Sequence, residues 1–161
     1  MHFLNRWESG MTAEDCIRDK RFNLRLEQIR LAYEELILFR DEYCDQAHII
    51  THGYDNPIPT NKKAKFIFGI VQVKPWIKPY MDQKKVPLGA MQEDVVSIMI
   101  ARLNKMLDQL CASTSRMVKV ETVGTLKKGD WRDEIHANKQ GFKKIAGKFL
   151  QVIDNIESQQ V

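Results

Sequence analysis

Cysteine is scarce in this chain, and the three cysteines lie far apart along it. Cys16, Cys44 and Cys111 show neither the close spacing of a zinc site nor the even number expected of a disulfide framework. This excludes a small disulfide-rich fold and predicts free, buried or partly buried thiols in a reducing compartment.

Long apolar runs are also missing. Residues 1–7 do not combine a basic segment with an apolar core, so we predict no signal peptide. No stretch approaches the roughly 20 apolar residues that a membrane-spanning helix needs. We therefore expect a cytoplasmic protein without a membrane partner.

An excess of one charge is lacking as well, since the net charge is only +4. The lysine doublets are scattered and mixed with acidic residues, and neither a basic stripe nor a nucleic-acid-binding motif is present. We therefore expect no nucleic-acid partner. A chain of 161 residues that is 43% hydrophobic and 29% charged suits one globular domain, residues 1–161.

Hydrophobic periodicity predicts an α/β protein. Apolar residues recur every three or four positions in 22–43, 89–111 and 139–156, which indicates three amphipathic helices. The β-branched run 47–51 and the alternating run 117–123 indicate strands. A helix between two strands is typical of a parallel βαβ unit.

The first of these helices is expected only to pack. Its charged residues, including Arg30 and Arg40, are predicted to lie on the surface opposite an apolar face. The residues of that face are Phe22, Leu26, Ile29, Tyr33, Leu36, Ile37 and Tyr43.

Two strands alone make a small sheet. Either residues 66–73 add a strand, or the chain pairs with another polypeptide. Residues 62–87 are otherwise expected to form a long excursion over the strand ends, with a short helix near 76–81. Its aromatic residues either line an apolar pocket or anchor the loop in the core; these are Phe66, Phe68, Trp76 and Tyr80.

Polar residues follow both predicted strands. The loops 52–61 and 124–138 fall at the same edge of a parallel sheet, where ligands bind in open α/β sheets. The first loop brings His52, Tyr54 and Asp55, and the second brings Trp131. These four residues are the candidate substrate pocket, although His52 also fits a hydrogen-bonded structural histidine.

An acidic residue lies three positions before a histidine in the second loop. Asp133 and His136 are candidates for general acid–base chemistry. In the simpler alternative, Asp133 only caps the following helix and His136 lies at the surface. A further hypothesis is a metal site made by both residues with His52 and Asp55. We expect no metal and no other cofactor.

Residues 131–146 read Trp-Arg-Asp-Glu-Ile-His-Ala-Asn-Lys-Gln-Gly-Phe-Lys-Lys-Ile-Ala. This stretch resembles the last conserved block of SGNH (GDSL-type) hydrolases, with its Asp-x-x-His element, an Asn and a Gly before the final helix. Residues 49–59 are also similar to a segment of some bacterial members. The resemblance covers residues 22–156 and corresponds to the C-terminal half of such a domain.

The resemblance implies a partial flavodoxin-like, three-layer α/β/α fold with a short parallel sheet. It also implies an ester hydrolase acting on a small ester or acylated substrate, with His136 as general base and Asp133 as the carboxylate that orients it. Ala137 stands where the family usually has Pro.

The family's nucleophile and oxyanion hole have no counterpart in this chain. It contains no Gly-Asp-Ser block and no Gly-x-Asn-Asp block. None of its serines lies in a nucleophile-like turn; these are Ser9, Ser97, Ser113, Ser115 and Ser158. We therefore expect a truncated or split hydrolase, inactive alone, which needs a complementing N-terminal half or forms a homo-oligomer. The alternative is a non-catalytic α/β module that self-associates through an exposed sheet edge.

Overall fold

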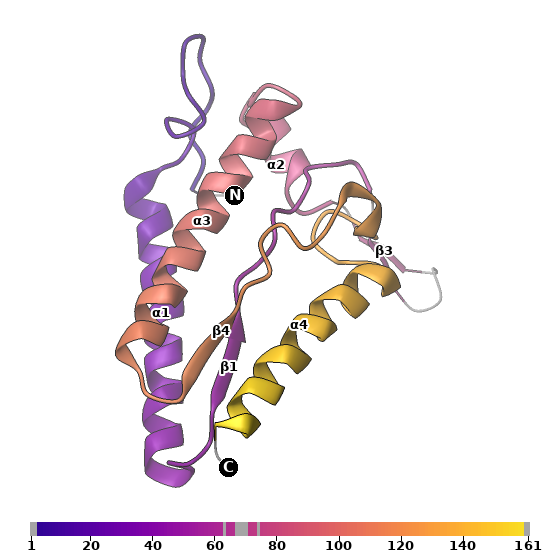
Figure 1. The fold of residues 1–161 in the computed structure, drawn as a ribbon. Coiled ribbons are helices and arrows are strands. Elements are labelled where there is room, and N and C mark those ends of the chain that lie inside the picture. Colours follow the sequence, from indigo (N-terminus) through magenta and orange to yellow (C-terminus); the bar gives the residue numbers. More distant parts are fainter. Residues whose placement is uncertain (1–2, 63, 67–70, 74, 160–161) are drawn as a thin grey trace.

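The computed structural model is a mixed α/β fold that is mostly helical. The residues described here are 3–62, 64–66, 71–73 and 75–159. Three long helices dominate them: α1 (Asp19–Tyr43), α3 (Ala90–Ser113) and α4 (Lys139–Ser158). Figure 1 shows α1 and α3 side by side on one face of a small sheet and α4 on the other. None of the described helices is both long and apolar enough to span a bilayer.

The sheet consists of two parallel strands, as the sequence predicts. Strand β1 (Ile49–His52) pairs with β4 (Met117–Val120), and Ile49 lies opposite Met117. β1 starts two residues later than predicted because the Ala47 amide still donates to the carbonyl of Cys44 in a turn. β4 ends at Val120, three residues early, and the chain then turns towards the loop after β1.

The described residues of the segment 64–73 do not enlarge this sheet. Strand β2 (Ala64–Phe66) and strand β3 (Val71–Val73) pair with each other, antiparallel, in a separate two-stranded sheet. The predicted addition of a strand from 66–73 is therefore wrong for the described part of that segment, while 67–70 lie outside the described residues. The predicted short helix is confirmed as α2 (Lys78–Gln83).

Helix α1 packs through only part of its apolar surface. Tyr33 and Ile37 contact the hydrophobic cluster formed by α3 and β4. The hydroxyl groups of Tyr33 and Thr51 are hydrogen-bonded at 2.6 Å. A neighbouring row of apolar residues spaced by three and four positions is exposed. The prediction that α1 only packs against the rest of the chain is therefore correct for part of its apolar surface and wrong for this row. This row, named the α1 outer stripe, consists of Ile29, Ala32, Leu36, Phe39 and Tyr43.

Arg40 is buried rather than at the surface, which corrects the prediction. Only 4% of it is exposed. Its guanidinium donates to the carbonyls of Ala47, Ser115 and Arg116 at 3.0–3.3 Å. These carbonyls precede β1 and β4, so Arg40 ties the last turn of α1 to the starts of both strands. Periodicity predicted that Arg40 lies with the surface charges, but in three dimensions it meets three backbone carbonyls that accept its hydrogen bonds.

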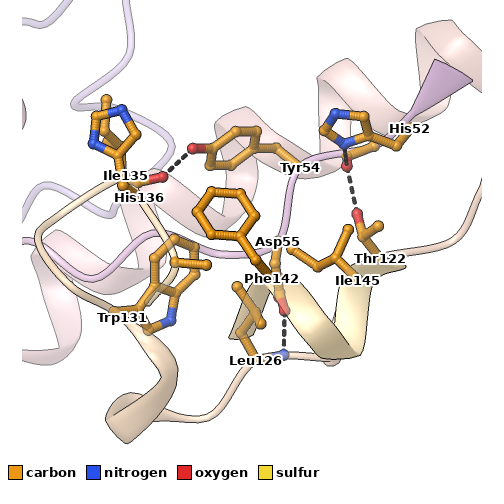
Figure 2. A pocket seen from close by; sticks show the side chains of 12 residues that line it. His52, Tyr54, Asp55, Thr122, Leu126, Trp131, Ile135, His136, Phe142 and Ile145 are labelled. Atoms are coloured by element: carbon orange, nitrogen blue, oxygen red, sulfur yellow. Dashed lines mark hydrogen bonds between the residues drawn. The ribbon is translucent and has the colours of Figure 1, made fainter. Parts of the chain in front are cut away.

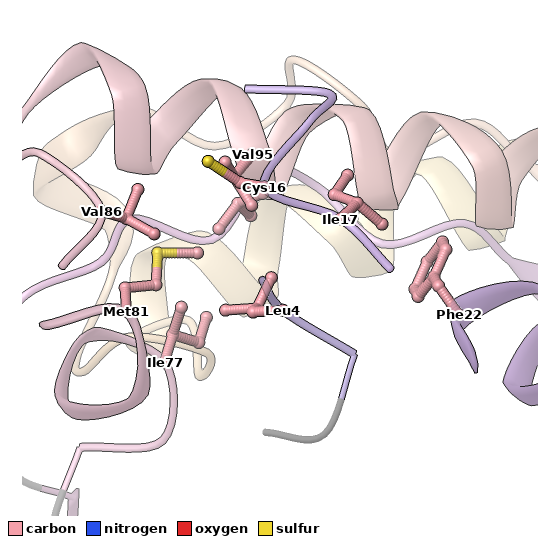
Figure 3. Packing of buried hydrophobic residues seen from close by; sticks show 9 residues of the cluster. Leu4, Cys16, Ile17, Phe22, Ile77, Met81, Val86 and Val95 are labelled. Atoms are coloured by element: carbon pink, nitrogen blue, oxygen red, sulfur yellow. The ribbon is translucent and has the colours of Figure 1, made fainter. Parts of the chain in front are cut away.

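The main hydrophobic cluster fastens the N-terminal segment and α2 onto α3. Figure 3 shows Leu4, Met81 and Val95 meeting between these elements. Ile77 belongs to the same cluster, and Ile135 packs against it. The cluster therefore fixes the chain at Ile77 and also contacts the Asp133–His136 loop through Ile135.

The buried guanidinium makes a direct prediction about stability. We expect Arg40→Ala to lower the free energy of unfolding by about 2–3 kcal/mol, because it removes three hydrogen bonds that a buried, charged side chain donates. Arg30→Ala is the matched control, since Arg30 lies on the same helix and pairs with Glu27 and Glu34 at the surface. Urea denaturation of both variants measures the difference. Equal, small losses would contradict the role assigned to Arg40.

Candidate functional site

The loops after β1 and β4 meet at the carboxyl edge of the sheet. Asp55, 6% exposed, accepts hydrogen bonds from the amides of Gly124 (2.9 Å) and Leu126 (2.6 Å). The Thr122 hydroxyl donates to the carbonyl of Gly53. The two loops are therefore joined by side-chain to backbone bonds, and Asp55 has a structural role in joining them.

Asp133 and His136 form a close pair. His136 Nδ1 lies 3.0 Å from Oδ1 and 3.1 Å from Oδ2 of Asp133. The Asp133 side chain is 1% exposed and the His136 side chain 31% exposed. Oδ1 also accepts the amides of Ile135 (3.2 Å) and His136 (2.9 Å), so the same carboxylate shapes the turn and holds the ring.

The simpler alternative, in which Asp133 caps the final helix, is wrong. The N-cap of α4 is Asn138, whose side chain accepts the Gly141 amide at 3.0 Å. His136 is half-buried instead of lying free at the surface. Both residues thus belong to the loop that precedes the helix.

The carboxylate of Asp133 is held in its ionised form. Burial raises its pKa, but the amides of His136 and Ile135 and the His136 ring outweigh burial, so the net pKa lies below the ordinary value. The pKa of Tyr54 is raised by burial and by the nearby Asp133 charge. Its hydroxyl stays protonated at neutral pH and donates to the carbonyl of Ile135.

A cavity of about 260 Å³ lies beside His136. Figure 2 shows the rings of Tyr54, Trp131 and Phe142 gathered between the two loops and the start of α4. All four predicted pocket residues line this cavity, and so does His136. Asp133 does not line it. The lining residues are His52, Gly53, Tyr54, Asp55, Thr122, Leu126, Trp131, Ile135, His136, Ala137, Phe142 and Ile145.

The sequence did not single out the apolar wall of this cavity. Phe142 and Ile145 line the cavity and belong to the apolar face of the predicted helix 139–156, for which the sequence predicted no role in a site. Phe142 is 54% exposed, so it borders an opening. Periodicity alone gave no signal that this face ends at a cavity.

His52 combines both roles considered for it. Its Nδ1 is 2.7 Å from the Gly53 carbonyl, and its ring packs edge-on against Phe149 with ring centroids 5.6 Å apart. It is thus hydrogen-bonded structurally and also lines the cavity. None of the five serines lines the cavity.

The metal hypothesis receives no support from the described residues. Among them, no three histidine, cysteine, aspartate or glutamate side chains are grouped to hold an ion. The carboxylates of Asp55 and Asp133 are already bound to backbone amides. All three cysteines are free, and Cys44 is exposed rather than buried.

Two other residues lie close to the pair. The ring of Trp76 is 4.9 Å from that of His136 between centroids. Glu134 is 1% exposed and accepts the backbone amides of Thr60, Ile77 and Lys78. Trp76 was among the aromatic candidates, whereas Glu134 carried no signal because its bonds reach residues more than 50 positions away.

The lowered pKa of Asp133 makes stability depend on pH. The ionised carboxylate stabilises the fold above the unfolded pKa of about 3.9, and this contribution is lost as the pH falls through the lower folded value. We expect Asp133→Asn to reduce the free energy of unfolding by about 1–3 kcal/mol at pH 7. The difference from the unaltered chain should shrink below about pH 4.

Urea denaturation at several pH values measures this difference. The control is Asp154→Asn, an exposed aspartate of α4, which should leave stability within error. A difference that stays constant down to low pH would contradict an ionised, stabilising Asp133.

No protein-family model, curated protein or solved structure matches the chain.

Proposed function

We propose that this chain carries the Asp–His part of a Ser-His-Asp triad and serves as the fragment or subunit of an SGNH-type ester hydrolase. One observation carries the proposal: a buried carboxylate holds the ring of a half-buried histidine in the wall of an apolar cavity. The Asp-x-x-His resemblance and the parallel strand pair between helices are consistent with it.

The geometry supports general-base chemistry. Asp133 lies at Nδ1 of His136, which favours the tautomer with its proton on Nδ1 and its lone pair on Nε2. That lone pair takes the proton of a serine hydroxyl as the oxygen attacks an ester carbonyl, and the carboxylate stabilises the resulting imidazolium. The imidazolium then gives the proton to the leaving alkoxide. No cofactor enters these steps.

The cavity fits the acyl part of a small ester. Leu126, Phe142 and Ile145 supply an apolar wall, and the rings of Tyr54 and Trp131 extend it. Burying apolar groups there gains about 25 cal/mol per Å² of buried surface. Apolar binding beside the base holds a carbonyl close to it, which is the positioning that such catalysis needs.

The proposed nucleophilic serine comes from another polypeptide segment, because none of the five serines of this chain lines the cavity. Among the described residues, β1 pairs with β4 alone, and parallel sheets normally have further strands and both faces covered. The α1 outer stripe is apolar and exposed, with Phe39 58% and Tyr43 64% exposed. We infer that a complementing half with the nucleophile and oxyanion hole extends β1 and covers this stripe.

The proposal predicts activity only for the combined parts. The chain alone should hydrolyse p-nitrophenyl butyrate no faster than its His136→Ala variant. Expressed together with the sequence encoded immediately upstream, it should hydrolyse the ester at a rate that falls by about 10²–10⁴-fold in His136→Ala. His48→Ala is the control, because His48 does not line the cavity.

Two outcomes would contradict it. Robust, His136-dependent turnover by the chain alone would show that its nucleophile is already present. Turnover by the combined protein that is indifferent to His136 and Asp133 would show that the pair is not catalytic.

A second candidate is a non-catalytic module that self-associates. The observation that favours it is the same exposed surface, the α1 outer stripe, together with a sheet in which, among the described residues, β1 and β4 pair only with each other. Residues at this spacing form one face of a helix, and such faces pair with a second helix.

Self-association predicts sensitivity to charge on that stripe. We expect Phe39→Lys to shift a dimer to monomer in analytical ultracentrifugation, because a buried lysine without a partner is costly. Ala101→Lys, at an exposed position of α3, adds the same charge elsewhere and should leave the dimer intact. A chain that sediments only as a monomer over a wide concentration range would exclude this candidate.

A further inference from the structure

We propose that Glu134 and Trp76 are positioning residues for His136: Glu134 clamps the excursion onto the Asp133–His136 loop, so that Trp76 fixes the imidazole from the side. This inference rests on the proposed function for its catalytic meaning, but the geometry that carries it is independent of hydrolysis.

Glu134 makes the clamp. Its carboxylate accepts the amides of Thr60 (3.0 Å), Ile77 (2.7 Å) and Lys78 (2.9 Å). With 1% exposure, this charge is tolerated only because backbone donors surround it. Thr60 precedes the excursion, and Ile77 and Lys78 lie within it, so one carboxylate joins the start of the excursion to its later part.

The clamp sets the place of Trp76. Ile77 is bound by Glu134 and is also buried in the main hydrophobic cluster, so the residue next to Trp76 is held twice. The indole then meets the imidazole of His136 edge-on, with ring centroids 4.9 Å apart and planes at 68°. Such an edge contact between rings is a favoured aromatic geometry.

The neighbouring residues Asp133 and Glu134 hold two different groups beside His136. The Asp133 carboxylate is hydrogen-bonded to Nδ1 of His136. The Glu134 carboxylate accepts the amide of Ile77, which is next to Trp76 in the sequence. A hydrogen bond at Nδ1 still allows the ring to tilt, whereas a flanking indole limits that tilt. The two contacts together hold the imidazole in one orientation, which general-base catalysis requires.

The contact can be measured from the histidine ring itself. In spectra of ¹³C-labelled histidine, the His136 ring signals, assigned by their loss in His136→Gln, carry a ring-current shift from Trp76. We expect Trp76→Leu to abolish this shift. Glu134→Gln should abolish it too, since an amide presents N–H to one of the backbone donors. The signals of His48 should not move in either variant.

Unchanged His136 signals in Trp76→Leu would overturn the ring contact, and unchanged signals in folded Glu134→Gln would overturn the clamp. If Glu134→Gln does not fold, amide hydrogen exchange of the unaltered chain decides. The clamp predicts slow exchange at Thr60, Ile77 and Lys78, and fast exchange there contradicts it.

Whether this positioning affects catalysis is tested by steady-state kinetics of the ester-hydrolysing assembly, the chain combined with its complementing half. Glu134→Gln should lower kcat while KM stays nearly constant, because ring orientation matters more in the transition state than in substrate binding. An unaltered kcat after loss of the ring-current shift would refute positioning. Absence of hydrolysis in the unaltered assembly would instead refute the proposed function and leave the spectroscopic result standing.

Discussion

The carboxylate of Asp133 is the group on which the candidate site depends. A buried charge must be matched by donors, and this one is matched by two amides of its own turn, by the ring of His136 and by the Arg132 guanidinium. The same bonds that make its burial tolerable shape the loop and orient the histidine. Removing the charge would therefore affect the fold and the site together.

Other acidic side chains at this edge of the sheet follow the same rule. Asp55 binds the amides of Gly124 and Leu126, and Glu134 binds the amide of Thr60 and two amides of the excursion. Asp130 binds the Lys127 amide and the Lys144 ammonium. A two-stranded sheet offers its loops little support, so buried carboxylates tie loop to loop. Of these carboxylates, Asp133 is hydrogen-bonded to a histidine ring, and the proposed chemistry therefore involves this residue.

The elements of the fold were largely predictable, and the reason is local. Helical spacing and β-branched runs depend on near neighbours, so the long helices and the parallel strand pair were found with small errors at their ends. The pocket residues His52, Tyr54, Asp55 and Trp131 were found because parallel strands bring their carboxyl ends together. Burial of Arg40 and Glu134 was not predictable, since their partners are distant in sequence. The exposure of the α1 outer stripe was missed for the opposite reason: periodicity identifies an apolar face without saying what covers it.

The central claim is that Asp133 fixes His136 in the tautomer that a general base needs. Long-range ¹H–¹⁵N spectra of the His136 ring at neutral pH test this most directly, with Asp133→Asn as the comparison. The account predicts a proton on Nδ1 of the neutral ring, hydrogen-bonded to the carboxylate, and loss of that preference in Asp133→Asn. A neutral ring protonated on Nε2, or one indifferent to Asp133, would contradict it.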